Sequence, residues 1–461
     1  MDTAGIGLLH LPEARTLLSH RMALESLLRD DLLEVHHLGA TVDAILLTGD
    51  LTREGTEFEF KRLDALLEAL IAHLQQTGAA RERPAVLAVP GWCDRVNVAD
   101  AFLSDDEWFR DRAVRAAFWR DVGEQRTRVA ESFAEFHAWF TGREQPEWAS
   151  VTHGLLPGDF VATLERDGSR LGIVGLNTTF LEVTDDALEA SVTFDREQFE
   201  SLFPERDVEV WRRSVHAAVL MTHRPSAWFH PTDLRLFREQ VAPSGRFAAH
   251  LHGFMDESAT VFGDDGVAEG NHATLSTSLS RIEPLASHHG YAQSRDFAYA
   301  ALRFDRDETE GTLRAWPRKM THEGHLQRFV ADSRFDVFED DAAARTVPLS
   351  DGHDAAWERY QRASAERGES QRTAPHRAIA HGPPTRDSLK LLLRNLFRDP
   401  SQFDSFCQEH FRDFYRNTRG LELSRKIATL VERVPPETVV TKLREENPAG
   451  FERYRHYLQH A

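Results

Sequence analysis

The chain has 461 residues, which is too long for one ordinary domain and predicts two or three. Its composition, 41% hydrophobic and 28% charged, is typical of a globular protein with a sizeable buried core. The sequence has no run of about 18 apolar residues, which argues against a membrane span. It does not open with the basic and apolar regions of a secretion signal. Two cysteines cannot build a disulfide framework, so we expect a cytoplasmic protein.

The negative charge is concentrated before the C-terminal region. The whole chain carries −19. Residues 387–461 contain 13 Lys and Arg against 11 Asp and Glu, a net charge of +2, so residues 1–386 carry −21. An acidic body disfavours non-specific binding to nucleic acids and lipids, and we expect neither a nucleic-acid nor a membrane partner. A small phosphate-bearing ligand held by a local cation is still compatible with this charge.

Apolar runs alternate with helical patterns over the first 90 residues. The runs predict strands at 5–10, 43–47 and 85–89. Apolar side chains recur every three or four residues on one face of each intervening helix: Leu24, Leu27, Leu28, Leu32 and Val35 on the first, and Phe60, Leu63, Leu67, Leu70 and Leu74 on the second. This order is typical of a parallel sheet, whose ligand sites lie at the carboxyl ends of the strands.

The rest of the chain predicts an insertion, more strands, a linker and a helical tail. Residues 98–148 are rich in aromatic side chains at helical spacing and predict a packed helical insertion. Further strands are expected at 160–165, 171–177, 216–223, 246–253 and 297–304. Residues 339–386 are polar, rich in Pro, Gly and Ser and without periodicity, which predicts a flexible linker. Residues 387–461 predict a small all-α bundle.

Polar motifs stand at five of the predicted strand ends. They read LLHLPEART (8–16), ILLTGDLTREGTEFEF (45–60), LAVPGWCD (87–94), VLMTHRP (219–225) and HLHGFMDE (250–257). In order and spacing they resemble the calcineurin-like metallophosphoesterases, whose motifs are D-x-H, G-D, G-N-H-[DE], H-x-P and G-H-x-H. The resemblance covers about residues 5–335. It implies an α/β domain over residues 1–338, a layered α/β-β/α sandwich with the helical insertion at about 98–148.

In that family the motifs hold two divalent cations, which bind a phosphate and activate a water molecule. The resemblance assigns metal ligation to Asp50 and His223, which are retained. It allows ligation by Glu13 and Asp256, because carboxylates suit hard cations. An active site of this kind would take Mn, Fe, Zn or Mg as its cofactor.

The other motif positions carry residues that do not suit this chemistry. Arg15 and Phe254 replace ligand histidines, Trp92 replaces the bridging Asn, and Cys93 replaces the His that protonates the leaving group. A guanidinium offers a metal no lone pair, and the sequence places no base to make Cys93 a nucleophile. We therefore assign no catalytic residue and expect no cofactor. Trp92 and Phe254 are bulky enough to fill the space of the metals.

Arg15 suggests what took the place of the cations. Its permanent positive charge is expected to pair with the carboxylates of Asp50, Asp256 and Glu13, because burying them without a counter-charge costs several kcal/mol. The alternative is that the motifs changed without forming any new arrangement.

The helical tail carries a second resemblance. The stretches LVERVPPE (430–437) and LREENP (443–448) are similar to the bacterial effector-associated, death-like domains, which recruit partners with a similar domain. This implies a protein partner bound through residues 387–461. The polar linker favours a tethered module over a docked one.

The leading hypothesis is a cytoplasmic bacterial pseudoenzyme with a metallophosphoesterase fold, inactive or strongly impaired. Its body acts as a scaffold or sensor and its tail as an adaptor, in bacterial conflict or defence signalling. The first alternative is a metal-dependent phosphoesterase, acting on phosphodiesters or nucleotides with a rearranged set of the four ligands named above. The second is a protein that holds a phosphorylated ligand through Arg15 and Arg224 without turnover.

Overall fold

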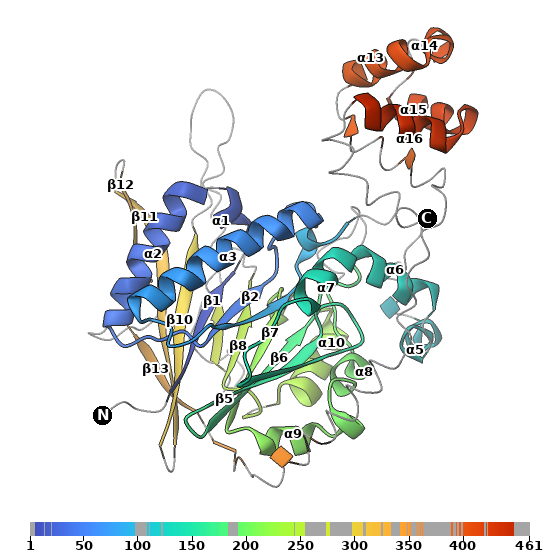
Figure 1. Ribbon diagram of the computed structural model, residues 1–461. Coiled ribbons are helices and arrows are strands. Elements are labelled where there is room, and N and C mark those ends of the chain that lie inside the picture. The colour runs from blue at the N-terminus through green and yellow to red at the C-terminus, as the bar shows by residue number, and fades with distance from the viewer. Residues whose placement is uncertain are drawn as a thin grey trace. The chain divides into compact units, whose positions relative to one another are not determined.

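The computed structural model describes most of the chain (Figure 1). The described residues are 5–12, 14–19, 21–96, 108–109, 111–120, 123–182, 192–243, 245–253, 273–276, 297–307, 310–323, 326–332, 342–347, 349–350, 352, 357–358, 360, 362, 389–390, 393, 396–397, 400–418, 421 and 423–446. Glu13, Phe254 and Asp256, three residues of the predicted site, lie outside them. The chain divides into two compact units, one of residues 1–98 and 102–371 and the other of residues 99–101 and 372–461.

The first unit contains a seven-stranded mixed sheet in the order β12-β11-β10-β1-β2-β3, with β13 paired to β11. The strands are β1 (Gly5–Leu11), β2 (Ala44–Thr48), β3 (Ala85–Val89), β10 (Ala298–Arg306), β11 (Gly311–Glu323), β12 (Leu326–Ala331) and β13 (Ala343–Val347). The strands β1, β2 and β3 run parallel, as predicted from the alternation of apolar runs and helical patterns. The remaining pairs are antiparallel.

The same unit contains a six-stranded sheet in the order β4-β5-β6-β7-β8-β9. Its strands are β4 (Ala149–His153), β5 (Phe160–Arg166), β6 (Ser169–Leu176), β7 (Ala217–Thr222), β8 (Ala249–His252) and β9 (Ala273–Ser276). The pairs from β6 to β9 are parallel, and β4-β5 and β5-β6 are antiparallel.

Helices accompany both sheets (Figure 1). Those between the first strands are α1 (Arg15–Ser19), α2 (Arg21–His37) and α3 (Glu57–Thr77), and the 3-10 turn η1 (Trp92–Asp94) follows β3. The predicted insertion contains α5 (Arg112–Arg120), α6 (Glu124–Ser132) and α7 (Ala134–Thr141). The second sheet is accompanied by α8 (Arg196–Glu200), η3 (Pro204–Arg206), α9 (Val208–Ser214), η4 (Ser226–Trp228), α10 (Pro231–Leu236) and the π-helical turn η5 (Phe237–Val241).

The second sheet is buried on both faces. Along β7, Val219 and Met221 belong to the cluster that contains the first sheet, α2 and α3. The alternate residues, Ala218 and Leu220, belong to the cluster that contains α8 and α9. Because successive side chains of a strand point to opposite faces, one face of this sheet packs on the first sheet and the other on helices. The mixed α/β class predicted from the sequence is confirmed.

The ends and the buried face of helix α3 are determined by its local sequence. Thr56 caps its N-terminus and forms a capping box with Glu59. Gly78, with φ of 79°, ends it in the left-handed conformation that glycine favours. Between these ends the predicted apolar face, from Phe60 to Leu74, is buried.

The predicted linker is wrong over its first part. Residues 343–347 form β13, which pairs with β11. Trp357 and Tyr360 then stack on each other and join the cluster on the helical side of the second sheet. A composition poor in apolar residues does not prevent this, because the backbone of β11 supplies the hydrogen bonds of the strand and two aromatic rings supply the buried area.

The second unit is helical where the structure describes it. Its helices are α13 (Pro400–His410), α14 (Arg412–Thr418), α15 (Leu423–Arg433) and α16 (Pro436–Glu446). They share an apolar core of their own, with Phe403, Phe406, Ile427, Leu430 and Leu443 almost fully buried. Within the described parts of both units, helices that combine the length and apolarity needed to cross a membrane are absent.

Candidate functional site

The candidate site lies where the chain leaves β2, β3 and β7. Two glycines allow these loops to meet. Gly49 has a φ of 88°, and a Cβ there would lie 2.4 Å from His223 Nδ1. A Cβ on Gly91 would lie 2.2 Å from the backbone nitrogen of Asp50. Both distances are too short for any side chain, so glycine is required at both positions for Asp50 and His223 to share one site.

Arg15 and Asp50 form the ion pair that the sequence predicts. Arg15 Nη2 lies 3.0 Å from Asp50 Oδ2, and the two side chains are only 12% and 5% exposed. The backbone N–H of Cys93 donates to the other carboxylate oxygen, Oδ1, at 3.1 Å. Arg15 Nη1 also donates to Cys93 Sγ. Both oxygens of Asp50 therefore already accept from donors within the protein.

These donors keep Asp50 ionised although it is buried. Burial alone would raise the pKa of Asp50, but the Arg15 guanidinium and the N–H of Cys93 hold it below its usual range. The backbone of Asp50 has a φ of 51°, which is uncommon for a residue other than glycine. The surrounding contacts thus fix both the charge and the orientation of this carboxylate.

His223 is fully buried and lies beside Asp50. Its Nε2 is 3.5 Å from Asp50 Oδ1, and its Nδ1 is 2.8 Å from the carbonyl oxygen of Thr48. Because a carbonyl only accepts, Nδ1 donates there and the Nε2 lone pair is directed toward Asp50. Burial lowers the pKa of His223 to about 4; Asp50 opposes this shift, and Arg224 adds to it. The ring is therefore neutral at pH 7, the state in which imidazole can bind a metal.

Cys93 and Trp92 occupy different environments. Cys93 is buried, and burial together with Asp50 raises the pKa of its thiol far above the ordinary value, so it is not a nucleophile. Trp92 is 38% exposed, and the Arg95 guanidinium lies 5.2 Å from its ring centroid. Trp92 is therefore not part of the closed interior of the site, and that it fills the space of the metals stays a prediction.

Asp94 ties together two of the site's loops. Its Oδ1 accepts from the backbone N–H groups of Leu51 and Thr52 at 2.7 and 2.8 Å, and from the Thr52 hydroxyl at 3.0 Å. Its Oδ2 accepts from the N–H of Gly91 at 2.8 Å. Burial and the neighbouring Asp50 raise the pKa of Asp94 to about 7, against the lowering effect of these donors. Asp94 is a positioning residue for Asp50.

Arg224, the second predicted phosphate contact, is held by other side chains. Its Nη2 lies 3.2 Å from Glu182 Oε1, and its guanidinium lies 5.0 Å from the Trp228 ring centroid. Arg15 is likewise engaged by Asp50. Neither arginine offers an anion an uncompensated charge, which disfavours the phosphorylated-ligand alternative at this place.

Sequence reasoning missed a buried hydrogen bond next to the site. His10 in β1 and Thr48 at the end of β2 are both fully buried, with His10 Nε2 2.8 Å from Thr48 Oγ1. Burial, with His252 nearby, lowers the pKa of His10 to about 3. The one sequence signal was a histidine inside an otherwise apolar strand.

The buried state of His10 predicts a dependence of stability on pH. Its pKa is about 3 in the folded chain and about 6.5 when unfolded, so unfolding takes up a proton between these values. The stability that the folded chain has with neutral His10 is fully present above pH 6.5 and is lost as the pH falls below that value. Between pH 7.5 and 5 the loss is about 2 kcal/mol. The measurement is denaturant unfolding at pH 7.5 and at pH 5. Over this interval the free energy of unfolding of His10→Gln should fall by about 2 kcal/mol less than that of the unchanged chain. Equal losses in the two chains would contradict the assignment.

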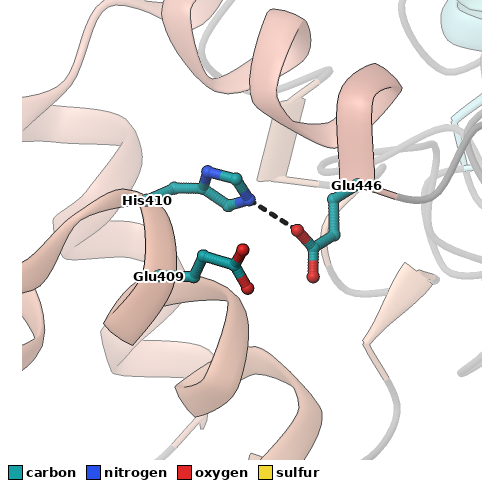
Figure 2. Close-up of side chains that lie close together, drawn as sticks. All are labelled: Glu409, His410 and Glu446. Atoms are coloured by element: carbon teal, nitrogen blue, oxygen red, sulfur yellow. Dashed lines mark hydrogen bonds and ion pairs between the residues drawn. The ribbon is translucent and has the colours of Figure 1, made fainter.

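In the described part of the chain, one set of three side chains has ligand atoms close enough to share a metal ion, and it lies in the second unit. Glu409, His410 and Glu446 place one such atom each within 4.8 Å of the others (Figure 2). His410 Nε2 is 2.6 Å from Glu446 Oε2, so α13 and α16 are joined at their ends by a hydrogen-bonded pair. An ordinary surface ion pair accounts for this arrangement. Asp50 and His223 have no described third ligand of this kind.

Comparison with known proteins does not assign a family. A scan against protein-family models finds no match, and a search of curated proteins finds none either.

Proposed function

We propose that the first unit is a metallophosphoesterase-like body that has lost two-metal hydrolysis and serves as a scaffold or sensor. The observation that carries this proposal is the buried ion pair between Asp50 and Arg15. The resemblance implies that this carboxylate would hold two cations, but its charge is already compensated by Arg15, and the N–H of Cys93 donates to its other oxygen. A divalent cation at Asp50 would also lie within a few Å of a permanent guanidinium charge, which repels it.

His223 and Asp50 remain side by side, which is the feature that favours the competing enzyme. In that alternative, Glu13 and Asp256 complete a rearranged metal site with them. Arg15 would first have to leave Asp50, and the loss of that ion pair from a buried place weighs against it.

A metal and activity measurement separates the two functions. The purified chain is incubated with excess Mn²⁺ and desalted, its bound metal is measured, and hydrolysis of bis(p-nitrophenyl) phosphate is followed. We expect far less than one Mn²⁺ per chain and a rate equal to that of Asp50→Ala. Stoichiometric metal, with turnover that Asp50→Ala abolishes, would establish the rearranged enzyme instead.

We propose that the second unit recruits a protein partner. It is a compact unit with its own apolar core, which supports an autonomous module. In a pull-down from a bacterial lysate, the full chain should retain a partner that a chain ending at residue 371 does not. Retention of the same protein by both chains would assign binding to the first unit and contradict the proposal.

A further inference from the structure

A second polar site lies at the opposite end of the six-stranded sheet. Helix α9, which precedes β7, and the loop before β8 line a pocket of about 390 Å³, together with Leu349 and Ser350, which follow β13. We call it the arginine pocket, after Arg212, Arg213 and Arg246 in its lining. His223 follows β7 whereas Arg212 and Arg213 precede it, so the six residues of β7 separate the two sites by about 20 Å.

The charges of the arginine pocket are not balanced. Glu209 is the acidic residue in its lining, and its Oε1 pairs with Arg246 Nη2 at 3.1 Å. Among the described residues, Arg212 and Arg213 have no carboxylate within ion-pair distance. Among the residues that the structure describes around the pocket, three guanidinium groups thus face one carboxylate, in a body that carries −21 over residues 1–386.

Backbone carbonyls hold the guanidinium groups of Arg212 and Arg246 in place, and each group keeps N–H donors that these contacts do not use. Arg212 Nε donates to the carbonyl oxygen of Arg246 at 3.0 Å, and its Nη atoms reach the carbonyls of Val215 and Gly245 at 3.4 and 3.5 Å. Arg246 Nη1 donates to the carbonyl oxygen of Val241 at 3.0 Å. Since a guanidinium has five N–H groups, each arginine retains donors for a ligand. Arg213 is exposed.

Helix capping explains only part of this arrangement. Arg212 and Arg213 lie in the last turn of α9, where a positive charge favours the helix dipole. That effect does not require Arg246, which comes from the loop before β8 and points into the same pocket. Burial lowers the pKa of Arg212; Glu209 opposes this, and Arg246 adds to it. Glu209 compensates only part of the positive charge, so an anion between the arginines would reduce the repulsion among their guanidinium groups.

We propose that the arginine pocket binds the phosphoryl group of a small anionic ligand. Planar guanidinium forks match phosphate oxygens in pairs, which gives both affinity and orientation. A volume of 390 Å³ falls in the range of small-molecule sites. The site is independent of Asp50, so it gives the body a ligand whether or not metal chemistry survives there.

The test uses pyrophosphate as the probe, with the full chain, in isothermal titration calorimetry at constant low ionic strength. We expect saturable binding that Arg213→Gln weakens about 10-fold or more, the loss typical of a hydrogen bond between charged groups. Arg213 is exposed, so this change should leave the fold intact. The matched control is Arg235→Gln on α10, which removes the same charge from a side chain that is 75% exposed. It should leave binding within about twofold, because it lies outside the pocket.

Inorganic phosphate and ADP identify the source of the phosphoryl group. Tighter binding of ADP than of pyrophosphate indicates a nucleotide, and equal affinity for phosphate and pyrophosphate indicates the free ion. The proposal is overturned if the unchanged chain shows no saturable binding of pyrophosphate. It is also overturned if the two arginine variants weaken binding equally, because the effect would then come from overall charge.

Discussion

Replacing Arg15 with methionine should lower the free energy of unfolding by about 3 to 5 kcal/mol. The change removes the guanidinium that lies 3.0 Å from Asp50 and leaves the carboxylate in a place where it is 5% exposed. His223 is neutral there and cannot replace the charge. The measurement is denaturant unfolding at pH 7.

A double-mutant cycle shows whether the loss belongs to this pair. Asp50→Asn removes the negative charge and keeps the side-chain shape, so the double variant should recover much of the stability lost by Arg15→Met alone. The matched control is Arg83→Met, which breaks a pair with Glu68 whose side chains are 47% and 50% exposed. Its cost should be at most about 1 kcal/mol. Equal costs for the two arginine changes, without recovery in the double variant, would contradict a buried pair at the site.

The strand ends of the site could be predicted from sequence because each motif follows an apolar run. Residues 43–47 and 85–89 predicted β2 and β3 almost to the residue, and their parallel pairing brings the residues after each strand to one edge. The Arg15–Asp50 pair followed from the resemblance, which places both residues at one site, and from charge, since a buried carboxylate requires a partner. These predictions depend on local pattern, on the motif resemblance and on elementary electrostatics.

The features that sequence reasoning missed depend on contacts between distant segments. In the turn η1, Trp92 is 38% exposed, whereas the next two residues, Cys93 and Asp94, are buried. The direction of three successive side chains in a 3-10 turn is set by the hydrogen bonds around it, which the residue types do not reveal. The strand β13 likewise depends on the free edge offered by β11, to which its own composition gives no signal.

The role of Asp94 in the site could not be predicted from the sequence either. Its type was known from the motif, but four donors from two loops converge on it only in the folded chain. They include the N–H of Gly91, the residue whose missing side chain lets Asp50 approach. The Asp94 carboxylate therefore fixes the position of the two loops that carry the site, whatever chemistry the site retains.

Replacing Asp94 with alanine should lower the free energy of unfolding by about 4 kcal/mol, because three buried N–H groups and a hydroxyl lose their acceptor at once. Asp94→Asn should cost about half as much, since its amide oxygen can still accept on one side. The control is Asp111→Ala: Asp111 is exposed and accepts from the N–H groups of Ala113 and Val114 at 2.8 and 3.3 Å. Water can replace that acceptor, so its cost should be about 1 kcal/mol or less. Denaturant unfolding of the three variants gives the order, and a loss for Asp94→Ala no larger than for Asp111→Ala would show that the carboxylate does not hold these loops together.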